Sequence, residues 1–295
     1  GSNKEDATVL DMLTHQARFQ PWIPFYKATL DSFNKPSEKY YRTRPTVEFQ
    51  LKVAEDLYLR RDYNDTILKV IANSELLPKK QYKYSDFSFI LFKEYLEREN
   101  GKSLEYLAEN NFYKYLGATS LTYNPLHKFD KSIVIPTEND NYFRYQKVHG
   151  YVHDMAAAMQ GGISGHAGLF SNALDIAKVM QMYLQKGSYG GKQFITEETL
   201  QKFNTCYFCK DGNRRGVGFD KPQLGNEGPT CGCVSLTSFG HTGFTGTMTW
   251  ADPEKEIVYV FLSNRTFPDS NASNKLSKEN IRENIQKVIY ESIIE

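Results

Sequence analysis

Polar residues that could do chemistry gather near the end of the chain, between Phe239 and Thr247. This segment begins with Phe239-Gly240 and His241-Thr242-Gly243, and it contains three glycines and three threonines. The runs at 248–250 and 257–262 predict two further strands, because the intervening residues 251–256 have the composition of a turn. A glycine beside a polar strand edge lets a second backbone lie close to the strand. The segment therefore indicates a place where a substrate or another chain can bind.

All four cysteines lie in a second candidate site, a loop-like region at 205–233. They form two close pairs, Cys206-x-x-Cys209 and Cys231-x-Cys233, with 21 residues between the pairs. Four thiolates in two such pairs fit a tetrahedral structural zinc site. Two disulfides in an oxidising compartment are the rival interpretation, and two reduced buried pairs are the third. A hydrolytic zinc is not expected, because four thiolates leave no open position on the metal.

Length and charge restrict the class of protein. The 295 residues suit one large domain or two small ones. The 36 basic and 35 acidic residues nearly cancel, and no basic tract stands out, so we do not expect a nucleic-acid partner. No apolar run approaches the ~18–20 residues that a membrane span needs.

The apolar pattern predicts the elements that must position these residues. Helical spacing and caps predict helices over 7–14, 86–99 and 103–116, and later over 172–186 and after Thr196. Residues 119–150 have the pattern of an extended loop, and 47–60 fit either a helix or a strand. A closing helix is expected over 277–295, with its apolar residues facing inward: Ile281, Ile285, Val288, Ile289 and Ile293. Helices in the middle and a small antiparallel sheet near the end define an α+β class.

Four segments resemble, in order, motifs of the penicillin-recognising serine hydrolases, the group of class C β-lactamases and D,D-peptidases. Residues 8–15 are similar to that family's Thr-x-x-Asp-Leu-Leu-Thr-His helix, and Tyr84-Ser85-Asp86 stands where the family has Tyr-x-Asn. Residues 161–171 resemble its Gly-Gly … Ala-Gly-Leu-x-Ser segment, and His241-Thr242-Gly243 resembles its Lys-Thr-Gly. The chain also looks like a subgroup that is often fused behind family 3 glycoside hydrolases.

The resemblance implies a fold. It is a β-lactamase/transpeptidase-like fold in which helices and a helical subdomain flank an antiparallel sheet. We expect a single such domain over 1–295, mostly helical over about 15–200. The Cys-rich loop, the strands and the closing helix then occupy about 201–295.

The resemblance also implies roles for particular side chains. Tyr84 would be the proton shuttle, which requires nearby cations to depress its phenol pKa from about 10. Asp86 either pairs with the family's catalytic lysine or is a helix-start residue favoured by the dipole. The charge of His241 would change near pH 6.5, whereas the family's lysine is a fixed cation, so an esterase or peptidase is favoured over a β-lactamase. The expected substrate-binding residues are Thr242, Gly243, Phe244 and Thr245.

Two further polar sites stand near the glycine-rich segment. His153-Asp154 is either a support for the catalytic residues or a structural hydrogen bond. His166 is expected near the floor of the site.

The family's Ser-x-x-Lys motif is not in its expected place before the Thr-His helix. The chain has one literal match, Ser32-Phe33-Asn34-Lys35, but Pro36 disfavours helical geometry at Lys35, so we interpret Ser32 as incidental. We therefore expect an N-terminally truncated piece of a serine hydrolase that is inactive by itself.

The alternative is a non-catalytic module that binds cell wall or steadies a fused glycosidase. The resemblance implies a periplasmic or cell-envelope location, a small or peptidoglycan-derived substrate and no catalytic cofactor. Because a truncated fold would expose a sheet edge, a homodimer is also expected.

Overall fold

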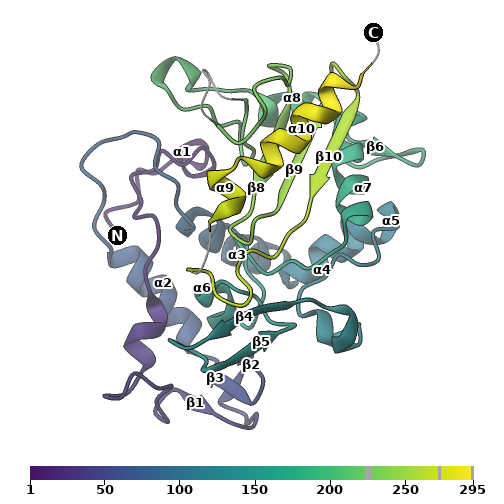
Figure 1. The fold of residues 1–295 in the computed structure, drawn as a ribbon. Helices are drawn as coiled ribbons and strands as arrows, with labels where there is room; N and C mark the ends of the chain where they lie inside the picture. The colour runs from purple at the N-terminus through teal and green to yellow at the C-terminus, as the bar shows by residue number, and fades with distance from the viewer. Residues whose placement is uncertain (223–227, 272–273, 294–295) are drawn as a thin grey trace. The chain divides into compact units, whose positions relative to one another are not determined.

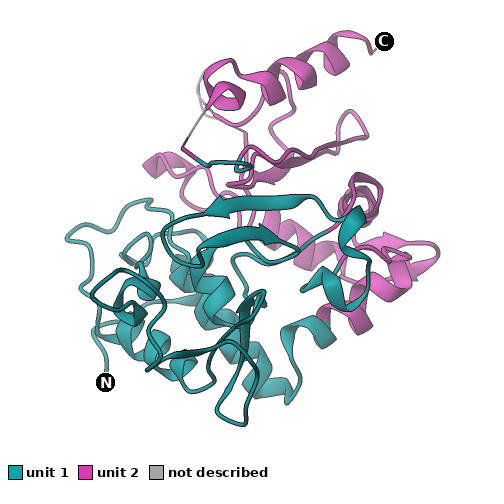
Figure 2. Ribbon diagram, turned by 60° about the horizontal axis from the view of Figure 1, so that its bottom comes forward, with its two compact units in different colours: residues 1–107, 122–170, 266–270 teal, residues 108–121, 171–265, 271–295 magenta. Residues whose placement is uncertain are grey.

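The computed structural model describes residues 1–222, 228–271 and 274–293 (Figure 1). The chain forms two compact units, each assembled from separate segments (Figure 2). Unit 1 contains residues 1–107, 122–170 and 266–270, and unit 2 contains 108–121, 171–265 and 271–295.

Unit 1 combines short helices with two small antiparallel sheets. One sheet has the strand order β1-β3-β2, and the other pairs β4 with β5. Its strands are β1 (Tyr41–Arg42), β2 (Phe49–Ala54), β3 (Leu57–Arg60), β4 (Pro136–Asp140) and β5 (Gln146–His149). Its α-helices are α1 (Val9–Leu13), α2 (Tyr63–Asn73), α3 (Phe87–Asn100), α4 (Leu104–Ala108), which ends in unit 2, and α6 (Met155–Met159), and its 3₁₀ turns are η1 (Phe25–Thr29), η3 (Pro125–His127) and η4 (Lys131–Ile133).

The core of unit 1 gathers around the start of α3. Phe87 and Ile90 are fully buried there and share one hydrophobic cluster with Ile67 and Ile71 of α2 and with Leu59 of β3. Helix α3 ends where the sequence predicted, because Gly101 takes the left-handed conformation that closes a helix at low cost.

Unit 2 is built on the antiparallel sheet β10-β9-β8. The strands are β8 (Phe239–Thr242), β9 (Met248–Asp252) and β10 (Ile257–Phe261). Alternate residues of a strand face opposite sides, so Ala251 packs with Met180 of α7 (Ala173–Leu184), whereas Trp250 lies on the other face with Tyr259. On that second face the Tyr259 hydroxyl donates to a backbone carbonyl of α10 (Ile281–Glu291).

The remaining elements of unit 2 are short. They are η2 (Glu109–Tyr113), α5 (Lys114–Leu116), β6 (Ser188–Tyr189), β7 (Lys192–Gln193), α8 (Glu197–Asn204), η5 (Cys209–Asp211) and α9 (Lys275–Lys278). The predicted caps at Thr196 and Ser103 are confirmed, since each side chain accepts a backbone N–H of the helix that follows.

The closing helix differs from its prediction. Asn280 has a positive φ, and it separates α9 from α10. The side that faces inward is polar, because Gln286 is fully buried and accepts from the Cys231 N–H. Of the five residues expected inward, Ile281 is half-buried. The other four are exposed: Ile285 (42%), Val288 (65%), Ile289 (37%) and Ile293 (37%). The last two residues of the predicted helix, 294–295, lie outside the described part of the chain.

Two other expectations are corrected. Residues 119–150, expected as loop, contain β4 and β5, and 47–60 contain the hairpin β2–β3. The region expected as mostly helical therefore also carries strands. The mixture of helices and antiparallel strands is the expected α+β class. Among the described residues, no helix combines the length and apolar character needed to cross a membrane.

Candidate active site

Tyr84 lies on a loop that His15, just after α1, holds in place. The backbone N–H of Ser85 donates to Nδ1 of His15 over 3.1 Å, and that of Lys83 donates to the His15 carbonyl over 2.9 Å. The imidazole ring stacks on the Tyr84 ring, with 4.3 Å between centroids. His15 is 2% exposed and Tyr84 is 36% exposed, so a buried ring supports a phenol that reaches the surface of unit 1.

Asp86 stands at the N-cap position of α3, but its side chain makes no capping hydrogen bond. The segment is fixed through the backbone, because the Asp86 N–H donates to the carbonyl of Pro21 and the Ser85 hydroxyl donates to that of Gln20. The half-buried carboxyl group is therefore available for other partners.

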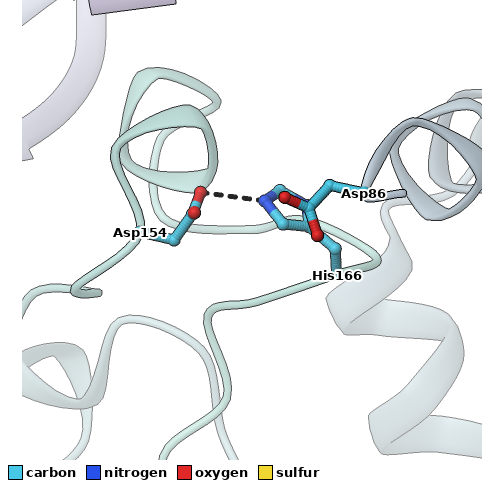
Figure 3. A group of neighbouring side chains, drawn as sticks. All are labelled: Asp86, Asp154 and His166. Carbon is cyan, nitrogen blue, oxygen red and sulfur yellow. Dashed lines mark hydrogen bonds and ion pairs between the residues drawn. The ribbon is translucent and has the colours of Figure 1, made fainter. Parts of the chain in front are cut away.

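Those partners are His166 and Asp154, which come from the glycine-rich loop and from the N-terminus of α6 (Figure 3). Nε2 of His166 lies 2.8 Å from Oδ1 of Asp154, and Nδ1 lies 2.9 Å from the hydroxyl of Ser164. One polar atom from each of Asp86, Asp154 and His166 lies within 4.8 Å of the others. We call these three residues the Asp-His-Asp cluster.

The cluster lies beside a small, mostly apolar cavity of about 20 Å³, room for a single water molecule. Asp86 and Asp154 line it together with Phe25, Phe87 and Met155 and their neighbours. Burial, and secondarily the charge of Asp154, raise the pKa of Asp86 to about 6, although His166 opposes the rise.

The other two pKa values move in the directions of an ion pair. Burial lowers the pKa of His166, but the charges of Asp154 and Asp86 outweigh burial, so this pKa is raised overall. Burial acts to raise the pKa of Asp154, but His166 and the Ala157 N–H hold it below its usual range.

Glycine residues let the loop of His166 approach α3 closely. A Cβ at Gly165 would overlap the carbonyl oxygen of Phe89, which lies in the first turn of α3. Gly168 has φ +123°, and a Cβ there would overlap the carbonyl oxygen of Gly162. The glycines of this motif therefore set the position of the imidazole.

A buried ion network holds the chain that leads to Asp154. The guanidinium of Arg144 is fully buried and lies 2.7 Å from both Glu138 and Asp140. It also donates to the carbonyls of Val152 and His153. His153 lies 3.4 Å from Glu138, so the predicted His153-Asp154 pair is not formed; Asp154 pairs with His166 instead.

In unit 2, His241 on β8 bonds to a buried arginine. Nη1 of Arg215 lies 2.9 Å from Nε2 of His241, and Nδ1 of the same imidazole lies 2.6 Å from the Thr242 carbonyl oxygen. A guanidinium only donates and a carbonyl only accepts, so the proton of the imidazole is on Nδ1 and the ring is neutral. Burial and Arg215 accordingly lower the pKa of His241.

The fixed positive charge that the sequence left in doubt is therefore present beside His241. Asp220 lies 2.7 Å from Arg215 and 3.5 Å from Arg214, so one carboxylate faces two guanidiniums. The three side chains together carry one net positive charge.

The expected substrate-binding residues lie at the end of β8 and in the turn after it. Thr242 is the last residue of β8, while Gly243, Phe244 and Thr245 belong to the turn and not to the strand. The Gly243 N–H donates to the Thr247 carbonyl over 2.8 Å. Arg265 holds the turn, since its guanidinium covers the Phe244 ring at 4.3 Å.

The cysteines are paired as two disulfides, Cys206–Cys209 and Cys231–Cys233. This pairing corresponds to the disulfide alternative. Both disulfides lie in unit 2, in the region that precedes β8.

Ser32 is not placed as a nucleophile. It lies in a turn, where the N–H of Lys35 donates to Asp31 and Asn34 has a positive φ. The ammonium of Lys35 lies 3.1 Å from the centre of the Tyr145 ring. A serine and lysine on one helix turn, which the motif requires, is not formed here.

Tyr84, Asp86 and His166, all selected from the sequence, lie in unit 1, and His241 and Thr242 lie in unit 2. No role for His15 or Arg215 was predicted from the sequence. The Thr-His motif was a signal for His15, but nothing in the sequence pointed to Arg215.

An α+β fold with a Tyr-x-Asp loop at a helix start and a His-Thr-Gly segment resembles the penicillin-recognising serine hydrolases, whose motifs are Tyr-x-Asn and Lys-Thr-Gly. The model of the Beta-lactamase family matches residues 1–280, and the chain belongs to this family.

Relatives and solved structures agree with this assignment. A protein of Escherichia coli O157:H7 named "Putative D-alanyl-D-alanine carboxypeptidase" is 36% identical over 204 residues, which cover 65% of this chain and 46% of that protein. The chain thus matches about half the length of this curated relative. The β-lactamase from Mycobacterium bovis superposes with a TM-score of 0.54 at 16% identity, covering 98% of this chain and 76% of the other. The penicillin-binding protein from Bacillus halodurans superposes with a TM-score of 0.58 at 14% identity, covering 88% of this chain and 70% of the other. These neighbours establish the β-lactamase/transpeptidase-like fold.

Proposed function

We propose that the chain is part of a serine hydrolase that transfers acyl groups from peptides ending in a D-alanine carboxylate, as in cell-wall precursors. The support for the reaction class is the family, and the support for the substrate is the name of the curated relatives. The location that this substrate implies is the cell envelope.

The observation that carries the proposal is the contact between Arg215 and His241. A terminal carboxylate needs a cation or strong donors beside the His-Thr-Gly strand. His241 is neutral, but Arg215, together with Arg214 and Asp220, supplies a net positive charge. This feature favours a carboxylate-ended peptide over a simple ester.

Within the proposed reaction, Tyr84 is the proton shuttle and Asp86 is the carboxylate beside it. The acyl-accepting serine and its lysine are not supplied by Ser32 and Lys35, because these two residues lie in a turn. We therefore propose that the 295 residues alone do not form an acyl-enzyme.

A pair of peptides tests the substrate. The complete gene product should cleave the terminal D-alanyl-D-alanine bond of a peptide with a free C-terminal carboxylate faster than the same bond of the C-terminally amidated peptide. Arg215→Gln should reduce this preference about 10- to 100-fold, the value of a hydrogen bond to a charged group. Arg214→Gln is the matched control, and its effect should be smaller. Equal rates on the two peptides in the wild type would contradict the proposed substrate.

A further inference from the structure

The hydrogen bonds around His166 define which of its nitrogens carry protons. Nε2 faces Oδ1 of Asp154 at 2.8 Å. The pKa of Asp154 is held low, so its carboxylate can only accept. The proton of that bond is therefore on Nε2.

Gln160 defines the direction of the bond on the other side of the ring. Its side-chain amide N–H₂ donates to the carbonyl of Ala156 over 3.3 Å, which directs Oε1 toward Ser164. An amide oxygen only accepts, so the Ser164 hydroxyl is the donor in its 3.3 Å contact with Gln160. The Ser164 oxygen also lies 2.9 Å from Nδ1 of His166, where it can accept from a protonated nitrogen.

The same ring faces Asp86. Asp154 and Asp86 act on His166 by charge, and His153 acts on Asp154. Two carboxylates thus face one imidazole ring in unit 1, where the His166 side chain is 2% exposed (Figure 3). Without a cation between them, two carboxylates at this separation would strongly oppose each other's ionisation.

We propose that His166 is held as an imidazolium by Asp154 and Ser164, and that it positions the Asp86 carboxylate by charge. His166 is in this sense a positioning residue for the acyl transfer proposed above, on which its functional meaning rests. In the family motif the position of Asp86 is an asparagine, which needs no counter-ion. This chain has a carboxylate there and supplies the counter-ion from the glycine-rich loop.

The test is a nuclear magnetic resonance titration of the 295-residue chain with ¹³C,¹⁵N-labelled histidine. The chain has six histidines, and His166→Gln identifies the signal of interest. At pH 6.5, the ordinary midpoint of histidine, both ring nitrogens of His166 should have the shifts of protonated nitrogen. Asp86→Asn should lower the His166 midpoint by about one pH unit, the usual effect of a carboxylate within ~4–6 Å.

A matched control separates charge from general disturbance. Asp65→Asn makes the same change on the exposed surface of α2 and should leave the His166 midpoint unchanged. A His166 that is mostly neutral at pH 6.5 in the wild type overturns the proposal and needs no variant to observe. A midpoint that Asp86→Asn does not move also overturns it. Neither result depends on acylation. The titration can therefore contradict the proposal for His166 while the proposed hydrolase activity stands, and a failed activity test would leave the titration result unchanged.

Discussion

Replacing Asp86 by asparagine should make unit 1 more stable at neutral pH. The pKa of this carboxyl is raised from 3.8 to about 6, chiefly by burial and then by Asp154. A shift of about two pH units at about 1.4 kcal/mol per unit gives about 3 kcal/mol. This is the ceiling of the gain, because the asparagine amide must also be desolvated.

The sign of the pH dependence follows from proton binding. Between about pH 4 and pH 6 the folded chain retains a proton on Asp86 that the unfolded chain has lost, so stability falls as pH rises through this window. Above this pH window Asp86 is ionised in both the folded and the unfolded chain, and the full free-energy cost of burying its charge is present. The advantage of Asp86→Asn should therefore be small at about pH 4 and largest at about pH 7.5.

Urea unfolding of chains labelled with ¹⁹F-tryptophan measures this difference. The chain has two tryptophans, Trp22 in unit 1 and Trp250 in unit 2, so each unit has its own signal. The Trp22 transition should move to higher urea in Asp86→Asn and stay in place in the exposed control Asp65→Asn. The reasoning would be refuted if the gain in the free energy of unfolding from Asp86→Asn were the same at both pH values. It would also be refuted if the variant were less stable than the wild type at about pH 7.5.

Other parts of the structure make separate predictions. Arg144→Met should destabilise unit 1 by about 3–5 kcal/mol in urea, since it leaves two buried carboxylates without their cation, whereas the exposed Arg60→Met should have little effect. Gly165→Ala should lower the free energy of unfolding by about 1–3 kcal/mol, because the new Cβ overlaps the backbone of α3. A change below about 0.5 kcal/mol would mean that the loop moves to accommodate the methyl group. By intact mass, the unreduced chain should weigh four hydrogens less than the reduced chain, and it should bind no zinc. An unreduced chain that has the mass of the reduced chain and binds zinc would restore the metal alternative. The exposed apolar side of α10 should make the chain dimeric in light scattering, with Val288→Glu monomeric; a monomeric wild type at high concentration would count against this.

Local patterns predicted what depends on neighbours in the sequence. Thr196 and Ser103 were identified as caps because a cap acts within three residues of itself. The strands β8 to β10 were predicted because their alternation and their connecting turn are local. The motifs of the family also placed Tyr84 and Asp86 correctly before a helix.

Long-range pairing explains what was missed. His15 bonds to Ser85, 70 residues away, and Arg215 bonds to His241, 26 residues away, and no periodicity links such partners. Asp154 was expected to pair with the adjacent His153, but Asp154 is the N-cap of α6, and its carboxylate pairs with His166.

The face of α10 was predicted wrongly for a related reason. Its apolar stripe suggested the buried side, yet the fixed hydrogen bonds of Gln286 and Tyr290 turn the polar side inward. Helical periodicity identifies a stripe, but the partner of that stripe is a tertiary property.

The measurement that tests the central claim most directly is intact mass after treatment with a fluorophosphonate and, separately, with a penicillin. Both the 295-residue chain and the complete product of its gene would be treated. The account predicts a covalent adduct on a serine of the complete product and none on the 295-residue chain. An adduct on Ser32, or no adduct on either protein, would contradict it.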